Sequence, residues 1–310
     1  MTETRVQGEP FRVIDQGCAI LDRSERGKLA LTGAGAKAFL GGQVSNDTEA
    51  LTPGHGVYAA LLTPKGKMLA DLRVLDCGDE LWLDTERAGL QPLFDALRRG
   101  TIGHDAELHK RTLQQALFSL LGPRAREVAG ADAAGLGSAE HDNARGEVGG
   151  VPVLAVRTDA GVDLVCDADR TEELRAALGL EEIDGEVLRV EAGRPRYGVD
   201  LDESVIPQEA GLNDRAVSFT KGCYVGQETV ARLFYKGRPN RHLRGLRLSA
   251  PVAPGTPLRL GEREVGRLTS VAASPRFGDI GLALVRREAE PGAVLDAGEA
   301  TAEVVELPFG

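Results

Sequence analysis

From about Arg241 to its C-terminus, the chain consists of short strand-like runs separated by turns of proline and glycine, such as SAPVAPGTP and ASPRFGD. Turns at such short intervals leave little room for helices and favour strands that pair with their neighbours in antiparallel order. We therefore expect a small C-terminal antiparallel β-barrel or sandwich over residues 238–310, with the break before it supplied by GRPNR.

The preceding residues show a different pattern, because short strand-like runs alternate with short helices. Residues 29–33 indicate a strand that leads into a helix, which Gly41 and Gly42 are expected to end. Residues 130–150 are rich in glycine, alanine and polar residues, which is typical of a loose segment. The alternation predicts an α+β region, which we expect to cover residues 1–237 and to contain two subdomains.

Composition and charge exclude several protein classes. Lysine and arginine total 37 and the acids total 47, and this net charge of −10 repels polyanions in general. No apolar run approaches the ~20 residues of a membrane span, and the polar N-terminus lacks the apolar core of a signal peptide. Four cysteines without a C-x-x-C pair form neither a disulfide framework nor a zinc knuckle. The expected location is a reducing cytoplasm.

Cys223 stands out because of its neighbours in the segment SFTKGCYVGQE. It follows Gly222, precedes Gly226 by three positions, and lies two positions after Lys221. Glycines let the backbone bend and approach a ligand, while a nearby ammonium favours the thiolate over the thiol. The remaining cysteines lie in or at the end of apolar runs, which favours structural roles for Cys18, Cys77 and Cys166.

Four roles for Cys223 stay open. A nucleophile needs a base, and no histidine is near it in sequence. A stable cluster usually takes four thiolates, so one cysteine could hold a cluster only transiently, shared with a partner. A redox or sulfur-handling thiol needs exposure and a low pKa, which Lys221 and the glycines favour. The simplest alternative is a small buried hydrophobic residue.

Other motifs predict no site. Gly33 and Gly35 open a helix, but Ala38 stands where a dinucleotide fingerprint needs its third glycine. The five histidines show no metal-ligand spacing, and no G-x-S-x-G elbow is present.

Glu191 lies near the end of a short helix, where the dipole disfavours negative charge. From the residues alone it is a surface glutamate or a partner of Arg189 or Arg194.

The octapeptide KGCYVGQE resembles the signature of the YgfZ family of folate-binding proteins. That family is implicated in building or repairing iron–sulfur clusters and belongs to the superfamily of the glycine-cleavage aminomethyltransferase (T-protein). The similarity covers most of the chain in the family's order, through VSNDTEAL, LLTPKGKMLADLRV, LRVEAGRPRYGVDL and VGRLTSVAASPRFGDIGLALV. It implies an aminomethyltransferase-like folate-binding fold of mixed sheets with short helices, followed by the β-barrel, and tetrahydrofolate as the cofactor.

The resemblance also implies site residues. Glu191 matches a glutamate that accepts hydrogen bonds from the pterin, whose ring N–H and amino group are parallel donors. Glycine-cleavage aminomethyltransferases carry Asp-Asp-Leu on the strand that here reads Ala70-Asp71-Leu72, and an aspartate there serves one-carbon transfer. The missing acid argues against aminomethyl transfer and leaves Asp71 as a structural or ligand-orienting carboxylate. Chemistry falls to Cys223 and Lys221, and the other expected folate contacts are Asn46, Tyr197, Tyr224, Gln227 and Arg232.

Asn46 has a second interpretation, as part of an Asx turn with Asp47. Tyr197 is open in the same way, because it could be packing filler. Arg232 heads the basic part of the chain and is the better candidate for a cofactor carboxylate.

These features favour a folate-binding accessory protein that supports the assembly or repair of iron–sulfur enzymes, with those enzymes or their assembly proteins as partners. One alternative is a folate-dependent aminomethyltransferase. Another is a tRNA-modification-related RNA-binding protein that uses residues 221–247, which contain seven bases and one acid. Those bases could equally form a solvated face, and the net charge weighs against RNA. A non-catalytic scaffold with an incidental cysteine is the blandest possibility.

Overall fold

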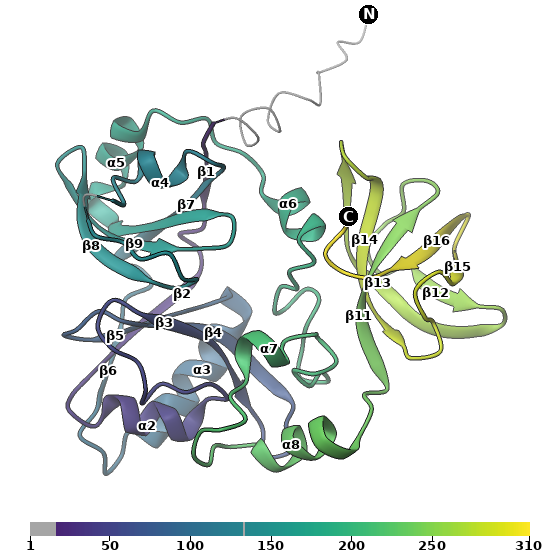
Figure 1. Ribbon diagram of the computed structural model, residues 1–310, viewed down its shortest axis with the longest axis horizontal. Helices are drawn as coiled ribbons and strands as arrows, with labels where there is room; N and C mark the ends of the chain where they lie inside the picture. Colours follow the sequence, from purple (N-terminus) through teal and green to yellow (C-terminus); the bar gives the residue numbers. More distant parts are fainter. Residues whose placement is uncertain (1–16, 133) are drawn as a thin grey trace, which may run out of the picture. The chain divides into compact units, whose positions relative to one another are not determined.

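The structure is a computed structural model that describes residues 17–132 and 134–310, and it divides into two compact units (Figure 1). The first contains the residues up to Leu61, Ala70–Asp184 and Lys221–Tyr224. The second contains Leu62–Leu69, Gly185–Thr220 and Val225–Gly310. Cys223 therefore groups with the first unit, although the residues on either side of its short segment group with the second.

One five-stranded sheet has the strand order β3-β4-β5-β2-β6. Its central strands are buried along most of their length because they carry long apolar runs, such as LALT and MLADLRVLD. Helix α3 (Arg87–Gly100) is amphipathic and buries Leu93 and Leu97, as their spacing predicts. The strands are β2 (Gly27–Thr32), β3 (Gly56–Leu62), β4 (Met68–Asp76), β5 (Leu81–Thr85) and β6 (Glu107–Lys110).

Helix α2 (Ala36–Gln43) continues through Gly41 and Gly42, where the sequence predicted its end. The prediction is wrong because Gly41 serves close packing rather than a turn. A Cβ atom on Gly41 would lie 3.1 Å from Glu49 Oε1 and 3.4 Å from Thr48 Oγ1. The missing side chain thus lets the following turn pack against the end of the helix.

The second sheet has the order β1-β7-β10-β9-β8 and also lies in the first unit. Phe118, Leu164 and Leu174 are fully buried in its core, to which helices α4 (Ala125–Val128) and α5 (Thr171–Leu178) contribute. A short 3-10 turn, η1 (Ala168–Arg170), precedes α5. The strands are β1 (Ala19–Asp22), β7 (Gln115–Leu121), β8 (Asn143–Val148), β9 (Val151–Arg157) and β10 (Gly161–Asp167).

Residues 143–148 do not belong to the loose segment that the composition of residues 130–150 predicted. Their second half contains β8, which pairs antiparallel with β9 from Asn143 to Val148. Leu136 is buried in the core of the sheet. Asn143 donates from Nδ2 to the carbonyl of His55 at 3.1 Å. A few apolar and amide anchors therefore fix a segment whose average composition is that of a linker.

The second unit ends in a closed barrel of order β11-β14-β13-β12-β15-β16, which confirms the predicted C-terminal barrel and the fold class. Its interior holds apolar residues such as Leu246, Leu268 and Leu295, and along β15 the buried residues alternate with exposed ones. The strands are β11 (Arg241–Leu248), β12 (Pro257–Leu260), β13 (Arg263–Ser274), β14 (Gly278–Arg286), β15 (Val294–Ala297) and β16 (Ala300–Val305).

Three short helices precede the barrel in the second unit: α6 (Glu186–Glu191), α7 (Asn213–Ala216) and α8 (Gln227–Lys236). The carbonyl of Glu191, at the end of α6, accepts a hydrogen bond from the N–H of Phe309 at 3.0 Å. The end of this helix is thereby tied to the C-terminal segment. Across the described residues, the helices are too short or too polar to cross a bilayer.

Candidate functional site

Cys223 is exposed, whereas the other three cysteines are buried or half-buried. Burial raises the thiol pKa of Cys18 and Cys166 to about 11 and that of Cys77 to about 12, so these groups stay protonated at neutral pH. Their structural assignment agrees with this environment. Cys223 is the thiol that solvent and other molecules reach.

Lys221 fixes the segment that carries Cys223. Its ammonium donates to the carbonyls of Gly41, Val44 (2.8 Å) and Asn46 (2.9 Å). These three acceptors match the three hydrogens of an ammonium group. Partial burial lowers the lysine pKa, against the opposing charges of Asp47 and Glu49. Lys221 thus anchors its own segment to the end of α2, and its effect on the Cys223 thiol stays a prediction.

Tyr224 and Asn46 lie beside Lys221, so the structure brings three of the predicted residues together. The Lys221 ammonium is 5.1 Å from the centre of the Tyr224 ring, and burial raises the pKa of Tyr224 to about 12. Asn46 donates from Nδ2 to the carbonyl of Tyr58 at 2.8 Å. Asp47 Oδ1 accepts the N–H of Glu49 at 3.1 Å, which is the Asx-turn geometry.

Asp71 lies on β4 and is 5% exposed. Burial raises the pKa of its carboxyl group to about 6, opposed by a hydrogen bond from Tyr58 and by the charge of Arg26. The Tyr58 hydroxyl donates to Oδ2 at 2.6 Å, and Oδ1 is buried without a hydrogen-bond partner among the described residues. A carboxyl group with such a pKa exchanges protons near neutrality and can donate or accept a hydrogen bond.

Glu191 lies in the second unit and is 4% exposed. The Ser274 hydroxyl donates to Oε1 at 2.5 Å, and the Arg276 guanidinium donates to Oε2. The interpretation from the residues alone, a surface glutamate or a partner of Arg189 or Arg194, is therefore wrong. Arg189 instead pairs with Glu186 and Asp200, because its side chain leaves the opposite side of α6.

The remaining predicted residues also belong to the second unit. Tyr197 is buried, and its hydroxyl donates to the carbonyl of Met68 at 3.5 Å. Gln227 is the first residue of α8 and follows Gly226, whose φ of 89° lies in the left-handed region. Arg232 is exposed on the same helix. In the first unit, Tyr58 connects the cluster around Lys221 to Asp71, because its carbonyl accepts from Asn46 and its hydroxyl donates to Asp71. The other predicted residues, Glu191, Tyr197, Gln227 and Arg232, belong to the second unit.

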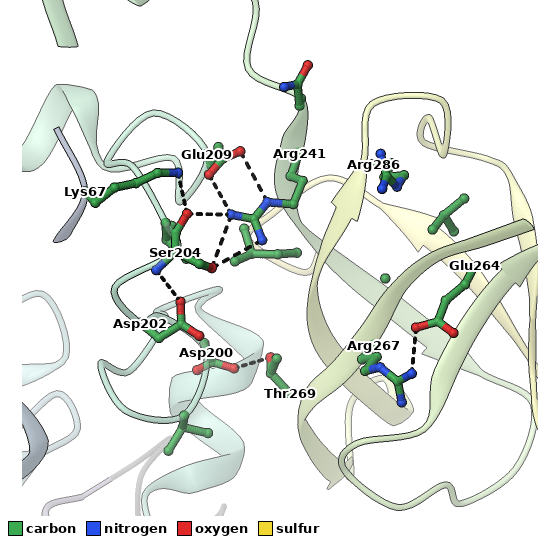
Figure 2. A pocket seen from close by; sticks show the side chains of 16 residues that line it. Lys67, Asp200, Asp202, Ser204, Glu209, Arg241, Glu264, Arg267, Thr269 and Arg286 are labelled. Carbon is green, nitrogen blue, oxygen red and sulfur yellow. Dashed lines mark hydrogen bonds and ion pairs between the residues drawn. The ribbon is translucent and has the colours of Figure 1, made fainter. Parts of the chain in front are cut away.

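The second unit contains a polar pocket with a volume of about 810 Å³ that contains none of the predicted site residues (Figure 2). Several of the charged side chains that line it are held by ion pairs or hydrogen bonds. Arg241 binds Glu209 (2.9 Å), Arg267 binds Glu264 (2.8 Å), and Thr269 donates to Asp200 (2.5 Å). The lining residues come from the loop before α7, from Lys67 and from β11, β13 and β14, so sequence order gave no signal for this pocket.

Sequence reasoning also missed Tyr58, Ser274 and Arg276. Ser274 and Arg276 lie in the quoted segment VGRLTSVAASPRFGDIGLALV, which was a signal for the region but not for a contact with Glu191. Tyr58 lies in the strand before Asp71, and its role depends on pairing that the sequence does not reveal. Among the described residues, no group of three histidine, cysteine or acidic side chains could hold a metal ion.

The GCVT N-terminal domain matches residues 4–221, and the glycine cleavage T-protein C-terminal barrel domain matches residues 241–309. The chain belongs to the glycine cleavage T-protein family. This confirms the superfamily that the motifs implied. Aminomethyltransferases of this family use tetrahydrofolate as substrate or cofactor.

Named relatives of this T-protein family member are similar over nearly the whole chain. The aminomethyltransferase of Streptomyces avermitilis is 32% identical, and the aligned region covers 94% of this chain and 86% of the aminomethyltransferase. A chloroplastic protein of Arabidopsis thaliana, named only provisionally as a transferase, is 27% identical over 97% of this chain and 73% of its own length. The crystal structure of the glycine cleavage system aminomethyltransferase T from Bartonella henselae has a TM-score of 0.85 at 22% identity, with 97% of this chain and 89% of that chain covered. That likeness confirms the fold.

Proposed function

We propose that this protein binds tetrahydrofolate and serves as a folate-binding accessory factor for iron–sulfur enzymes, with Cys223 as its reactive thiol. The observation that carries the proposal is the exposure of Cys223 within KGCYVGQE, in contrast to the three buried or half-buried cysteines. Family membership supports the folate, and the resemblance of the octapeptide to the YgfZ signature supports the iron–sulfur role.

The residues fit a reduced folate. Glu191 is a buried carboxylate that now receives one donor at each oxygen, and the pterin edge supplies two parallel N–H donors of the same kind. When bound, the folate supplies a carrier for a one-carbon unit or a source of electrons. The chain's own residues bind and orient it.

A single thiol sets limits on the role of Cys223. One cysteine does not supply the four thiolates that a stable cluster usually takes. An exposed thiol can meet a client protein, exchange with its thiols or share a cluster for a short time. Lys221 supports this role by holding the segment through three carbonyls, so that the thiol stands on an anchored turn. The cytoplasm is the proposed location.

The second candidate is a folate-dependent aminomethyltransferase. It has the more direct support from the comparisons, because several relatives carry that name. The buried Asp71, with a pKa raised to about 6, is a suitable proton-exchanging group for transfer chemistry. Against this candidate stands Ala70, where those enzymes carry a second acid. The RNA-binding alternative has no support from the comparisons.

The folate proposal is tested by calorimetric titration with tetrahydrofolate of the wild type, Glu191→Gln and the matched control Glu288→Gln. Glu288 is paired with Arg263 on the barrel and supplies no predicted contact. We expect wild-type binding and a loss of ~1.5–3 kcal/mol in Glu191→Gln, because a charged hydrogen-bond acceptor becomes neutral. Equal affinities for all three proteins would remove Glu191 from the pterin site.

The thiol is tested in cells that depend on this protein for the activity of an iron–sulfur enzyme. Cys223→Ser is expected to lower that activity severely, whereas the matched control Cys77→Ser retains it, because Cys77 is half-buried and does not belong to the octapeptide. Full activity of Cys223→Ser, together with ammonia release from a lipoyl-bound aminomethyl group in vitro, would establish the aminomethyltransferase instead.

A further inference from the structure

The carboxylate proposed to bind the pterin already has two partners within the second unit. Ser274 donates to Oε1 of Glu191 and Arg276 donates to Oε2, so that each oxygen receives one donor. The Glu191 side chain is 4% exposed and that of Arg276 is 49% exposed. The guanidinium is therefore the part of this cluster that solvent, and an arriving ligand, can reach.

A guanidinium and the pyrimidine edge of a pterin present the same pattern of donors. Arginine offers N–H groups in a rigid planar fork, and the pterin offers its ring N–H beside the amino group. Both patterns match a carboxylate, which is why each forms strong charge-assisted hydrogen bonds. While Arg276 donates to Oε2 of Glu191, a pterin N–H cannot approach that oxygen from the same direction.

The two partners of Glu191 differ in how easily they can leave. Ser274 closes the short turn between β13 and β14, and its Oγ accepts the N–H groups of Arg276 (3.0 Å) and Phe277 (2.9 Å). These bonds fix the hydroxyl and direct its hydrogen toward Glu191. Arg276 reaches the carboxylate by a long, half-exposed side chain, whose guanidinium also lies 5.9 Å from the centre of the Phe277 ring. Arg276 is thus the exchangeable partner.

We infer that Arg276 is an internal competitor of the pterin, which occupies Glu191 in the ligand-free protein and leaves when a ligand brings its own paired N–H donors. This inference rests on the proposed function and adds a specificity device to it. A buried carboxylate without a cation or donor is unfavourable, so Glu191 exchanges Arg276 only for a ligand that replaces those bonds. Folates and pterins with the amino group qualify, and analogues without it do not.

The competition lowers the apparent affinity for folate, because only the fraction of molecules with an open carboxylate can bind. Removing Arg276 removes this cost. We expect Arg276→Ala to bind tetrahydrofolate about 3- to 30-fold more tightly than the wild type in calorimetric titration. Arg276→Lys keeps the charge but loses the planar fork, so its affinity should lie between the two. Arg263→Ala, a charge-matched control at the start of β13, should stay within about twofold of the wild type.

Thermal unfolding supplies the second readout. Ligand-free Arg276→Ala should melt below the wild type, and saturating tetrahydrofolate should raise its melting temperature by more than it raises that of the wild type. Binding by Arg276→Ala where the wild type shows none would also support the inference.

The opposite results separate the two proposals. Equal or weaker binding by Arg276→Ala, with wild-type binding intact, would overturn the competitor and leave the folate proposal standing. Absence of binding by every variant would overturn the folate proposal, and the competitor would fall with it.

Discussion

Asp71 in the first unit and Glu191 in the second are carboxylates of almost equal burial, 5% and 4% exposed, in opposite surroundings. Glu191 receives a neutral donor from Ser274 and a cationic one from Arg276. Asp71 receives one hydroxyl, from Tyr58, and has a second oxygen without a partner among the described residues. Burial alone therefore does not decide the charge of a carboxyl group; the donors packed against it do.

Asp84 shows the same rule within the sheet that holds Asp71. It is fully buried, but Arg26 (2.6 Å) and Arg73 hold its pKa well below the ordinary range. Arg26 also acts on Asp71 through its charge, yet its guanidinium is bound to Asp84 and Glu86. The arginines of this sheet thus ionise Asp84 and leave Asp71 with a pKa of about 6, as a proton-exchanging group.

The substitution with the largest expected effect on this contrast is Asp71→Asn. The ordinary pKa of 3.8 applies to the unfolded chain, and the folded pKa is about 6, so the folded protein holds an extra proton between these values. The stabilising effect of that proton is complete below about pH 4 and is lost as the pH rises through about 6, by roughly 3 kcal/mol. Asp71→Asn cannot lose this stabilisation, because the asparagine amide does not ionise in this pH range. We expect the stability difference between variant and wild type to move by roughly 3 kcal/mol in favour of the variant from pH 4 to pH 8.

Urea unfolding across that range measures the difference. Asp79→Asn, at an exposed position paired with Arg145, is the control and should show a nearly constant difference from the wild type. A parallel pH dependence for Asp71→Asn and the wild type would mean that burial does not raise the pKa of Asp71.

The sequence predicted more of the fold than of the contacts at its candidate site. Strands such as β4 and the barrel turns follow from local apolar runs and from proline and glycine. The predicted helix end at Gly41 was wrong because close packing overrode local composition. The predicted loose segment was wrong at residues 143–148 because strand pairing did the same. Of the cysteines, Cys18 and Cys166 are buried as their apolar runs indicated.

The partners of the site residues depend on distant parts of the chain. The Arg276 contact with Glu191 joins residues 85 positions apart, and Lys221 binds the carbonyl of Gly41 across 180 positions. No local pattern carries such information. The resemblance to known families supplied Glu191 and Asp71 as candidates, but it did not supply the donors that set their chemistry.

The smallest expected effect, and the most specific, is that of Tyr58→Phe. The Tyr58 hydroxyl donates to Asp71 Oδ2 at 2.6 Å and thereby lowers the pKa that burial raises. Without it the folded carboxyl group should hold its proton to higher pH. Tyr58→Phe should therefore lower the free energy of unfolding, relative to the wild type, by about 1 kcal/mol more at pH 8, where Asp71 is ionised, than at pH 4.

The same urea experiment measures this effect, with Tyr235→Phe as the control because that ring is 67% exposed. Tyr58→Phe in the Asp71→Asn background should lose its pH dependence entirely, since no titrating group remains for the hydroxyl to stabilise. A pH-dependent effect that persists in the double variant would show that Tyr58 acts on another group, such as His141, whose ring lies 6.5 Å from it. In that case the hydroxyl does not set the charge of Asp71, and burial, opposed by the charge of Arg26, would have to explain the pKa of its carboxyl group.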